Sequence, residues 1–211
     1  SNISLPDVVF GCDITADNST IYVSYFSQMD AYSEGYAGIG VWRAAFKPFV
    51  DRIADNDIRL QWFCCDRSTG VTDASGKRVT LIRDTKYPVS VEYQTVKFFG
   101  TGRDNIKAGV FSGWGLGDYI YLRSEEAYMI KMEALAHKGS VEAVTELNSF
   151  MKTRQPDYNY TFTNKADLIE EIIYQKRVEF WGEGLEYIDN RRLNIPVDRT
   201  DETWGAENNN H

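Results

Sequence analysis

Paired carboxylates are the residues of this sequence best suited to acid–base chemistry. Glu126 and Glu133 lie seven positions apart in one helical stretch, so they would be about 10 Å apart along the helix axis. The carboxyl pairs of glycosidases are about 5–5.5 Å or about 6.5–9.5 Å apart, which this pair fits poorly. Glu179 and Glu183 are one turn apart, but Gly182 interrupts the helix between them. The spacing therefore argues against a glycan-cleaving enzyme.

The same carboxylates are better explained as structure. Glu126, Glu133 and Glu183 lie among apolar neighbours such as Met129, Leu135 and Phe180, and a carboxylate in such surroundings needs a cationic partner. Arginines are available nearby in the sequence. We predict no catalytic residue, and instead a structural charge network formed by Arg123, Glu126, Glu133, Arg177, Glu183 and Arg192.

Other chemistries have weaker support. The two histidines, His137 and His211, have no nucleophile or metal motif around them. Residues 55–57 (Asp-Asn-Asp) could help to hold calcium, but they lack the EF-hand pattern, which favours a solvated turn. Residues 113–117 (GWGLG) lack the lysine of a phosphate-binding loop, and a loop that displays Trp114 explains them equally well. We therefore predict no metal and no cofactor.

Aromatic residues gather near the N-terminus and give the clearest indication of function. Six of them fall within 21 residues: Tyr22, Tyr25, Phe26, Tyr32, Tyr36 and Trp42. Several lie in a stretch rich in Gly and Ser, where they cannot all be core residues. Neutral sugars bind by placing their C–H faces on aromatic rings, while amides and hydroxyls fix the sugar hydroxyls.

The sequence thus supplies candidate ligand contacts. They are the tyrosines Tyr25, Tyr32 and Tyr36, the polar residues Asn18, Gln28 and Asp30, and Trp114 as a second platform. For each tyrosine, packing against the helical part explains the residue as well as ligand contact does. Trp42, Trp62 and Trp181 are predicted to be core residues.

Composition excludes several partner classes. The chain has 211 residues, of which 43% are hydrophobic, so it should fold around a real core. Its net charge of −8, without a cluster of Lys and Arg, argues against nucleic acid and anionic polymers. No apolar run is long enough to span a membrane. Cys12, Cys64 and Cys65 form no disulfide framework; one bridge from Cys12 is an alternative, but all three are predicted to be small buried residues.

Residues 1–117 are predicted to be an irregular, ligand-facing region. Short strands are expected at 8–10 and 21–23, a loop at 28–40, a helix at 42–53, and further strands at 77–83 and 89–99. Residues 118–211 are predicted to be helical. Helices are expected at 119–138, 141–153, 165–181 and up to about 192, with Gly139 and Ser140 in the first turn and Asn164 as a cap. The fold class is mainly α, with TPR-like helix pairs and a few short strands.

Three segments carry a family likeness: LRSEEAYMIKMEALAHKG (122–139), EAVTELN (142–148) and LIEEIIYQKRVEFWGEGLEYIDNRR (168–192). Together they resemble the C-terminal signature of the SusD/RagB family. The chain departs from the family pattern at Lys176, where a Glu is usual, and at Lys152 or Arg154, where an Arg follows Leu-Asn.

The resemblance implies a fragment of a longer, surface-exposed outer-membrane lipoprotein of Bacteroidetes-type bacteria, anchored through an N-terminal segment outside this chain. It implies binding of a glycan, here a neutral oligosaccharide, or another nutrient for polysaccharide utilisation. It also implies a SusC-like TonB-dependent transporter as partner. The alternatives are a TPR-type scaffold that binds only a protein and, with less support, a glycan-active enzyme.

Overall fold

The computed structural model describes residues 4–15, 17–18, 24–30, 36–39, 43–63, 93–98 and 117–196. Several sequence predictions fall outside these residues: Tyr32, Trp42, Cys64, Cys65, Trp114 and the strands at 21–23 and 77–83.

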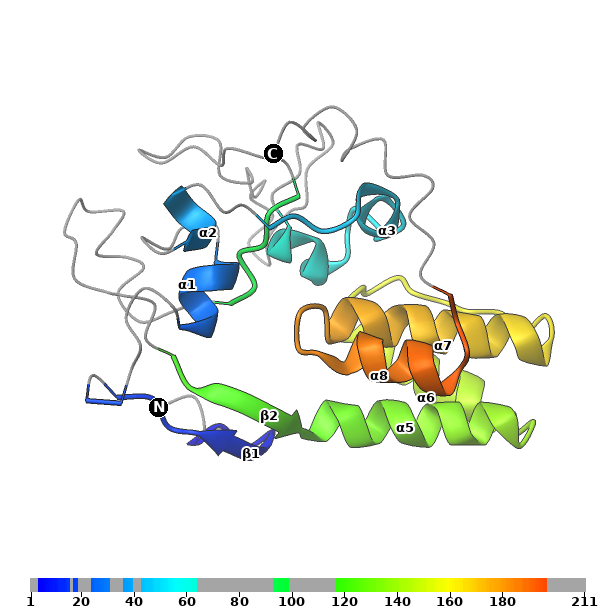
Figure 1. The fold of residues 1–211 in the computed structure, drawn as a ribbon. Helices are drawn as coiled ribbons and strands as arrows, with labels where there is room; N and C mark the ends of the chain where they lie inside the picture. Colours follow the sequence, from blue (N-terminus) through cyan, green and yellow to red (C-terminus); the bar gives the residue numbers. More distant parts are fainter. Residues whose placement is uncertain are drawn as a thin grey trace.

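A two-stranded antiparallel sheet joins the N-terminal segment to the start of the helical part. β1 (Val8–Cys12) pairs with β2 (Tyr119–Arg123), and β2 continues directly into helix α5 (Ser124–His137), as Figure 1 shows. The predicted helix at 119–138 is therefore wrong over its first five residues. The segment Tyr-Ile-Tyr-Leu-Arg is rich in residues that favour strands, and β1 supplies its backbone hydrogen bonds. Cys12 lies exposed at the end of β1, so its predicted burial is also wrong.

Four helices follow in the order that the sequence predicted. α5 is joined to α6 (Glu142–Lys152) by a turn at Gly139, which has a φ of +72°. The hydroxyl of Ser140 accepts the backbone N–H of Glu142 at 3.2 Å, as expected of a cap. α7 (Lys165–Glu179) begins at Asn164, whose side chain accepts the N–H of Asp167 at 3.0 Å. α8 (Leu185–Arg192) runs back beside it, and these helices confirm the mainly α prediction.

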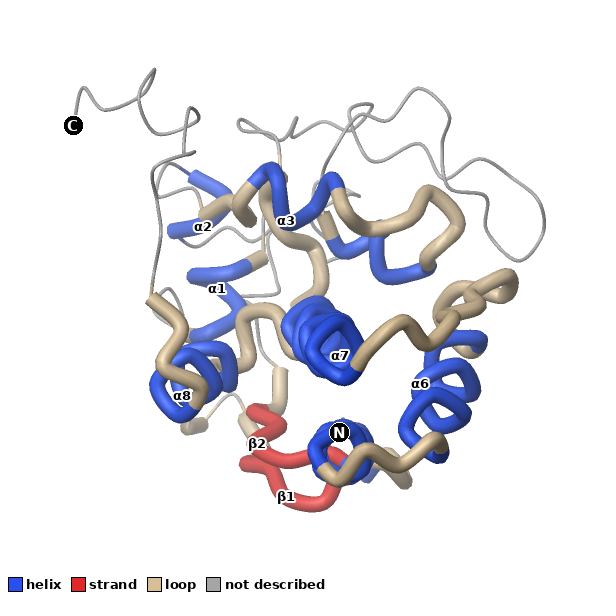
Figure 2. Tube along the Cα trace, turned by 90° about the vertical axis from the view of Figure 1, so that its right-hand side faces the viewer, coloured by secondary structure: helices blue, strands red, loops and turns tan. Residues whose placement is uncertain are grey.

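α7 is the central element. Figure 2 shows it end-on in the middle of the molecule, with α8 on one side, α6 on the other and the β1–β2 pair below. It packs against α5. Its own residues belong to two separate cores, with Ile172 in one and Tyr174 and Val178 in the other. The helix is therefore buried on more than one face, which fits its long run of buried residues.

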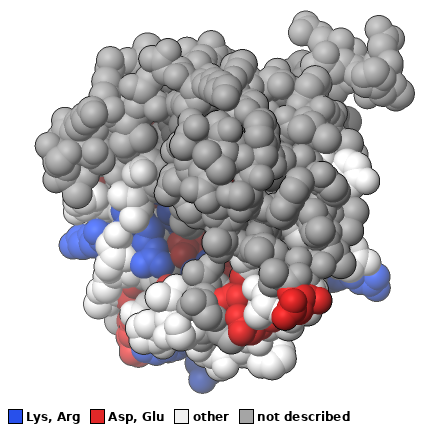
Figure 3. Space-filling model, turned by 90° about the vertical axis from the view of Figure 1, so that its left-hand side faces the viewer, with Lys and Arg blue, Asp and Glu red and all other residues white. Residues whose placement is uncertain are grey.

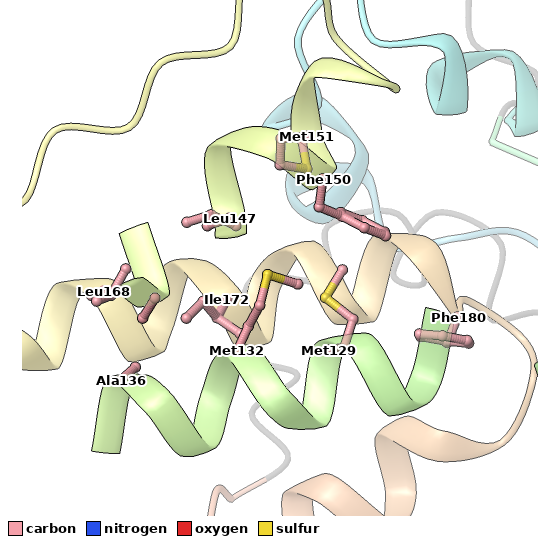
Figure 4. Packing of buried hydrophobic residues seen from close by; sticks show 10 residues of the cluster. Met129, Met132, Ala136, Leu147, Phe150, Met151, Leu168, Ile172 and Phe180 are labelled. Carbon is pink, nitrogen blue, oxygen red and sulfur yellow. The ribbon is translucent and has the colours of Figure 1, made fainter. Parts of the chain in front are cut away.

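The first core lies between α5, α6 and α7. Figure 4 shows Met129 and Met132 pointing from α5 toward the residues of the other two helices. The members of this core share a side-chain exposure below a tenth: Met129, Met132, Ala136, Ala143, Leu147, Phe150, Met151, Leu168, Ile172 and Phe180.

The second core attaches the N-terminal part to α7. It contains Ala45, Val50, Ile53, Leu60, Phe63, Tyr93, Tyr174 and Val178, with Trp62 and Trp181 half-buried against it. The residues come from α3 (Lys47–Asp51), from the 3₁₀ helix η3 (Ile58–Trp62) and from the isolated bridges Ala44–Gln94 and Phe63–Thr95. The helix expected at 42–53 is therefore shorter than predicted and consists of α3 alone. Of the strand expected at 89–99, the described residues 93–98 form only the two isolated bridges.

The loop predicted at 28–40 is partly helical. α1 (Tyr25–Met29) and α2 (Tyr36–Ile39) are both short helices. Ser24 caps α1, because its side chain accepts the N–H of Ser27 at 3.1 Å. The Gly and Ser residues of this segment led to the prediction of a loop. The Ser24 cap starts a helix there, which the composition did not indicate.

Candidate functional site

Glu179, at the last turn of α7, is the centre of a buried charge network. Its carboxylate lies 3.0 Å from Nη1 of Arg123, 3.1 Å from Nη2 of Arg154 and 3.5 Å from Nη1 of Arg59. The Glu179 side chain is only 3% exposed. Burial alone would raise the pKa of this carboxyl, but the three arginines outweigh burial and lower the pKa to about 2. Glu179 is therefore held ionised as a structural anion.

Arg59 is a fully buried member of the network. Its guanidinium donates to Asp57 at 2.7 Å and to the backbone carbonyl of Gln175 at 3.3 Å. Asp57 also caps η3 by accepting the N–H of Arg59 at 2.8 Å. Asp57 therefore serves the fold and lies buried. Among the described residues, no group of three or more His, Cys, Asp or Glu side chains could hold a metal ion.

Lys97 joins the network from residues 93–98. Its ammonium donates to the carbonyls of Glu179 at 2.7 Å and Trp181 at 3.0 Å, and to the carboxylate of Glu183 at 2.6 Å. These carbonyls are at the C-terminal end of α7, where helical carbonyls lack helical partners and favour a cation. The ammonium also lies 4.7 Å from the centre of the Trp62 ring. Burial lowers the pKa of Lys97 to about 8, although Glu183 acts in the opposite direction.

Opposite charges balance within this network. Its cations are Lys97, Arg59, Arg123 and Arg154, and its anions are Asp57, Glu125, Glu179 and Glu183. Figure 3 shows basic and acidic side chains next to each other on one face of the molecule. A balanced network can be buried at far lower cost than isolated charges.

The turn after α7 places Glu183 beside Arg123. Gly182 and Gly184 have φ values of +79° and +88°, which other residues adopt only with strain. A Cβ on Gly182 would also lie 2.8 Å from the Phe98 ring. The tight turn brings the Glu183 carboxylate to 3.0 Å from Nη2 of Arg123.

A cavity of about 560 Å³ opens beside Lys97, Arg123 and Glu183. Six aromatic side chains line it: Tyr25, Phe26, Trp62, Phe98, Tyr119 and Tyr121. β2, which leads into α5, contributes Tyr119, Ile120 and Tyr121, and α1 contributes Tyr25 and Phe26. The cavity thus combines an apolar wall with a small set of charged groups, as small-molecule sites commonly do.

The aromatic wall extends outward along the sheet. The Tyr119 and Tyr121 rings have centroids 6.5 Å apart, and the Tyr121 and Phe10 rings have centroids 5.6 Å apart. Tyr121 is 60% exposed and Phe10 is 63% exposed, so the outer end of this row faces solvent. Tyr119 is held in place because its hydroxyl accepts the backbone N–H of Tyr25 at 2.7 Å.

The structure places the predicted ligand contacts in different surroundings. Tyr25 lines the cavity, but its hydroxyl donates to the Gly182 carbonyl and its ring packs edge-on against Phe98 at 4.9 Å. Burial is the main cause that raises the pKa of Tyr25, and nearby Glu183 adds to it. Tyr36, on α2, is 43% exposed.

The predicted polar contacts lie apart from the cavity. Gln28 accepts hydrogen bonds from Arg43 with its side chain and its backbone, both at 3.0 Å. Asp30 is buried at the end of α1. Asn18 is exposed and bonds within its own loop, accepting the N–H of Thr15 at 2.7 Å. None of these three residues lines the cavity.

The residues of the predicted charge network fall into separate groups. Arg123 and Glu183 belong to the buried network. Arg192 on α8 forms a bidentate salt bridge with Glu133 on α5, with both N–O distances at 2.6 Å. Arg177 donates to Asn190 at 2.6 Å and lies 3.6 Å from Glu186.

Glu126 does not join either group. It lies in a groove between α5 and α8, and its carboxylate forms no ion pair with any described residue. Glu125, Glu179 and Arg154 take part instead, and Lys97 is a member that the sequence interpretation missed. The sequence indicated Glu179 only as a possible catalytic partner of Glu183, and Arg154 only as a departure from the family pattern. Nothing local indicated Lys97.

No family model and no curated protein matches the sequence. Among solved structures, the chain is similar to the crystal structure of a SusD-like carbohydrate binding protein from Bacteroides vulgatus. The TM-score is 0.62 and the identity is 22%, over 90% of this chain and 35% of that chain.

The fold is SusD-like. This confirms the sequence resemblance at the level of the fold, because the match covers almost the whole chain. The chain spans about a third of the length of the protein that it matches. Within the described part of this SusD-like chain, no helix is both long and apolar enough to cross a lipid bilayer.

Proposed function

We propose that this chain binds a glycan, most simply a neutral oligosaccharide, in the cavity between β2, α1 and the end of α7. One observation carries the proposal: six aromatic side chains and four charged side chains, Lys97, Asp118, Arg123 and Glu183, line one cavity of about 560 Å³. Pyranose rings present flat C–H faces to aromatic rings, and their hydroxyls need polar partners, so this mixture suits a sugar. The SusD-like fold supports the same ligand class.

Tyr121 is the residue most available to a sugar. It lies at the mouth of the cavity, 60% exposed, beside Tyr119 inside and Phe10 outside. A sugar chain that entered the cavity could therefore continue over the sheet. Tyr25, in contrast, supports the wall, because its hydroxyl and its ring are already engaged.

Binding without turnover fits the state of the carboxylates. A general acid in glycoside hydrolysis needs a raised pKa, whereas three arginines lower the pKa of Glu179 to about 2. Glu183 beside it is bonded to Lys97 and Arg123. These carboxylates stabilise the fold of the cavity wall and take no part in proton transfer in the proposed function.

We further propose that the glycan is bound at the cell surface for uptake through a SusC-like TonB-dependent transporter, with the longer protein lipid-anchored in the outer membrane. The SusD-like fold is the support for this step. Co-purification of the longer protein with a SusC-like transporter from a native membrane tests it. Recovery of the protein without any such transporter would count against the partner.

A glycan array followed by calorimetric titration tests the binding proposal. Saccharides that bind should lose about fivefold or more in affinity on Tyr121→Ala, since the variant removes an aromatic face worth about 1 kcal/mol or more. Tyr187→Ala is the matched control, because Tyr187 is 67% exposed on α8, away from the cavity. Equal affinity of the two variants would place the sugar elsewhere, and no binding by any saccharide would overturn the proposal.

A further inference from the structure

The donors of Lys97 are fully used by the protein itself. A lysine ammonium has three N–H groups. Those of Lys97 go to the carbonyls of Glu179 and Trp181 and to the carboxylate of Glu183, at 2.6–3.0 Å. The amine lines the cavity, yet it has no hydrogen left for a ligand.

Arg123 is almost as fully occupied, with four of its five N–H groups in hydrogen bonds. A guanidinium has five N–H groups. Nε donates to Glu183 at 3.2 Å, Nη1 donates to Glu179 at 3.0 Å, and Nη2 donates to the Glu183 carboxylate and the Glu179 carbonyl at 3.0 and 2.9 Å. Nη1 also lies 3.6 Å from Glu125. Taking Arg123 from these partners would leave buried carboxylates uncompensated, which is costly.

The acceptors of the cavity are not used up. A carboxylate offers about four acceptor positions, and Glu183 receives three hydrogen bonds: two on Oε1, from Lys97 and Arg123, and one on Oε2, from Arg123. Its side chain is 18% exposed, and it lines the cavity. The Tyr121 hydroxyl, at the mouth, makes no hydrogen bond with any described residue, so it can accept from a sugar hydroxyl or donate to one.

We propose that this cavity selects sugars by the hydrogen bonds that they donate: it takes neutral and amine-bearing glycans, binds the amine-bearing ones at least as tightly, and rejects glycans with uronic acid or sulfate groups. This inference rests on the proposed glycan-binding function. A hydroxyl or a protonated amine can donate to the free position on Oε2 of Glu183. A carboxylate or a sulfate there would find no free hydrogen on Lys97 and, on Arg123, only the second Nη1 hydrogen, which faces Glu125 at 3.6 Å, and it would lie against a second anion.

Selection of this kind is sharper than selection by shape alone. When a ligand leaves a charged group of the site unpaired, its affinity falls by orders of magnitude relative to a ligand that pairs it. A small change in apolar contact changes the ratio of affinities by only about tenfold to two-hundredfold. We expect uronic and sulfated counterparts to bind at least tenfold more weakly than the neutral glycan. The affinity for the amine-bearing counterpart should fall as salt concentration rises, because its attraction to Glu183 is screened.

The test is a glycan array that contains neutral, amine-bearing, uronic and sulfated oligosaccharides of matched linkage, applied to the unaltered chain. Each binder and its matched counterparts are then titrated by calorimetry at low and at high sodium chloride. Binding of neutral and amine-bearing glycans, together with no binding of their acidic counterparts, would support the inference. An acidic counterpart that binds as tightly as the neutral glycan, or an amine-bearing one that binds more weakly, would overturn it and leave the binding function standing. Absence of every saccharide signal would overturn both.

A variant pair assigns the selectivity to its residue. Glu183→Gln keeps the shape of the side chain and removes its charge, so the affinity for an amine-bearing glycan should fall about tenfold relative to the neutral one. Glu186→Gln is the control, because Glu186 is an exposed carboxylate on α8 outside the cavity. Equal ratios in the two variants would contradict the role of Glu183. If Glu183→Gln does not fold, the selectivity of the unaltered chain still decides the inference.

Discussion

Replacing Glu179 by glutamine tests whether the buried network holds the two parts of the described chain together. The carboxyl has an ordinary pKa of 4.5 and a pKa of about 2 in the folded chain. At about 1.4 kcal/mol for each pH unit between these values, ionisation of Glu179 stabilises the fold by about 3 kcal/mol at neutral pH. Removing one partner of a buried ion pair costs about 3–5 kcal/mol, which agrees.

The assay is urea denaturation of Glu179→Gln, with Glu170→Gln as control, because Glu170 is an exposed carboxylate on the same helix. At pH 7 we expect a loss of about 3 kcal/mol for the first variant and below about 0.5 kcal/mol for the second. For a chain of this size, the first value corresponds to a Tm lower by about 6–12 °C.

The pH dependence gives a second check with a defined sign. Because the folded pKa lies below the unfolded one, the stabilisation is present above pH 4.5 and is lost as the pH falls toward 2. The difference between the unaltered chain and Glu179→Gln should therefore shrink to about 1 kcal/mol at pH 3. A loss no larger than that of Glu170→Gln, or a difference that does not change with pH, would refute the reasoning.

Three further perturbations have defined outcomes. Met132→Ala should cost about 2–5 kcal/mol in urea denaturation, because Met132 is fully buried, whereas Ile130→Ala on the exposed face of the same helix should cost far less. Gly182→Ala should destabilise the chain more than Gly139→Ala: both have positive φ, but only the Cβ at 182 would meet an aromatic ring, at 2.8 Å. Burial and a carboxylate at 2.7 Å raise the pKa of Tyr158, so stability should fall as the pH rises above 10, and Tyr158→Phe should make that fall less steep.

Each of these three predictions has its own contradicting result. Equal costs for Met132→Ala and Ile130→Ala would mean that the first core is not packed as described. Equal costs at the two glycines would mean that the turn has room for a side chain. An unchanged alkaline slope in Tyr158→Phe would mean that the phenol is not buried beside its carboxylate.

The ends of the helices could be predicted because their signals are local. Asn164 followed by Asp167 marks the start of α7, and Gly139, Gly182 and Gly184 mark turns with positive φ. Each feature depends on residues within one or two turns of the chain. The resemblance in residues 122–192 identified the SusD-like fold for the same reason, since its motifs lie on these helices.

The start of α5 was predicted wrongly because it depends on a distant segment. Residues 119–123 form a strand only through their pairing with Val8–Cys12, more than a hundred positions away. No local pattern announces that pairing, and the helical spacing that follows was extended back over it. The exposure of Cys12 has the same origin, since its place on an edge strand depends on this sheet.

The cavity was only partly predictable. Tyr25 was identified as a candidate contact, and it lines the cavity, but the structure shows its hydroxyl and ring already engaged. Lys97 binds the end of α7 from more than eighty positions away, so its role depends on tertiary packing. Tyr119 and Tyr121 were assigned to a helix, and they became wall residues only once that segment proved to be a strand.

A crystal structure of the chain with an oligosaccharide that binds it on the array tests the central claim most directly. The account predicts a sugar ring against Tyr121 in the cavity, with a hydroxyl or amine donating to the free oxygen of Glu183 and with the Lys97 and Arg123 contacts unchanged. A saccharide bound only outside this cavity, or one with an acidic group paired to Arg123, would contradict it.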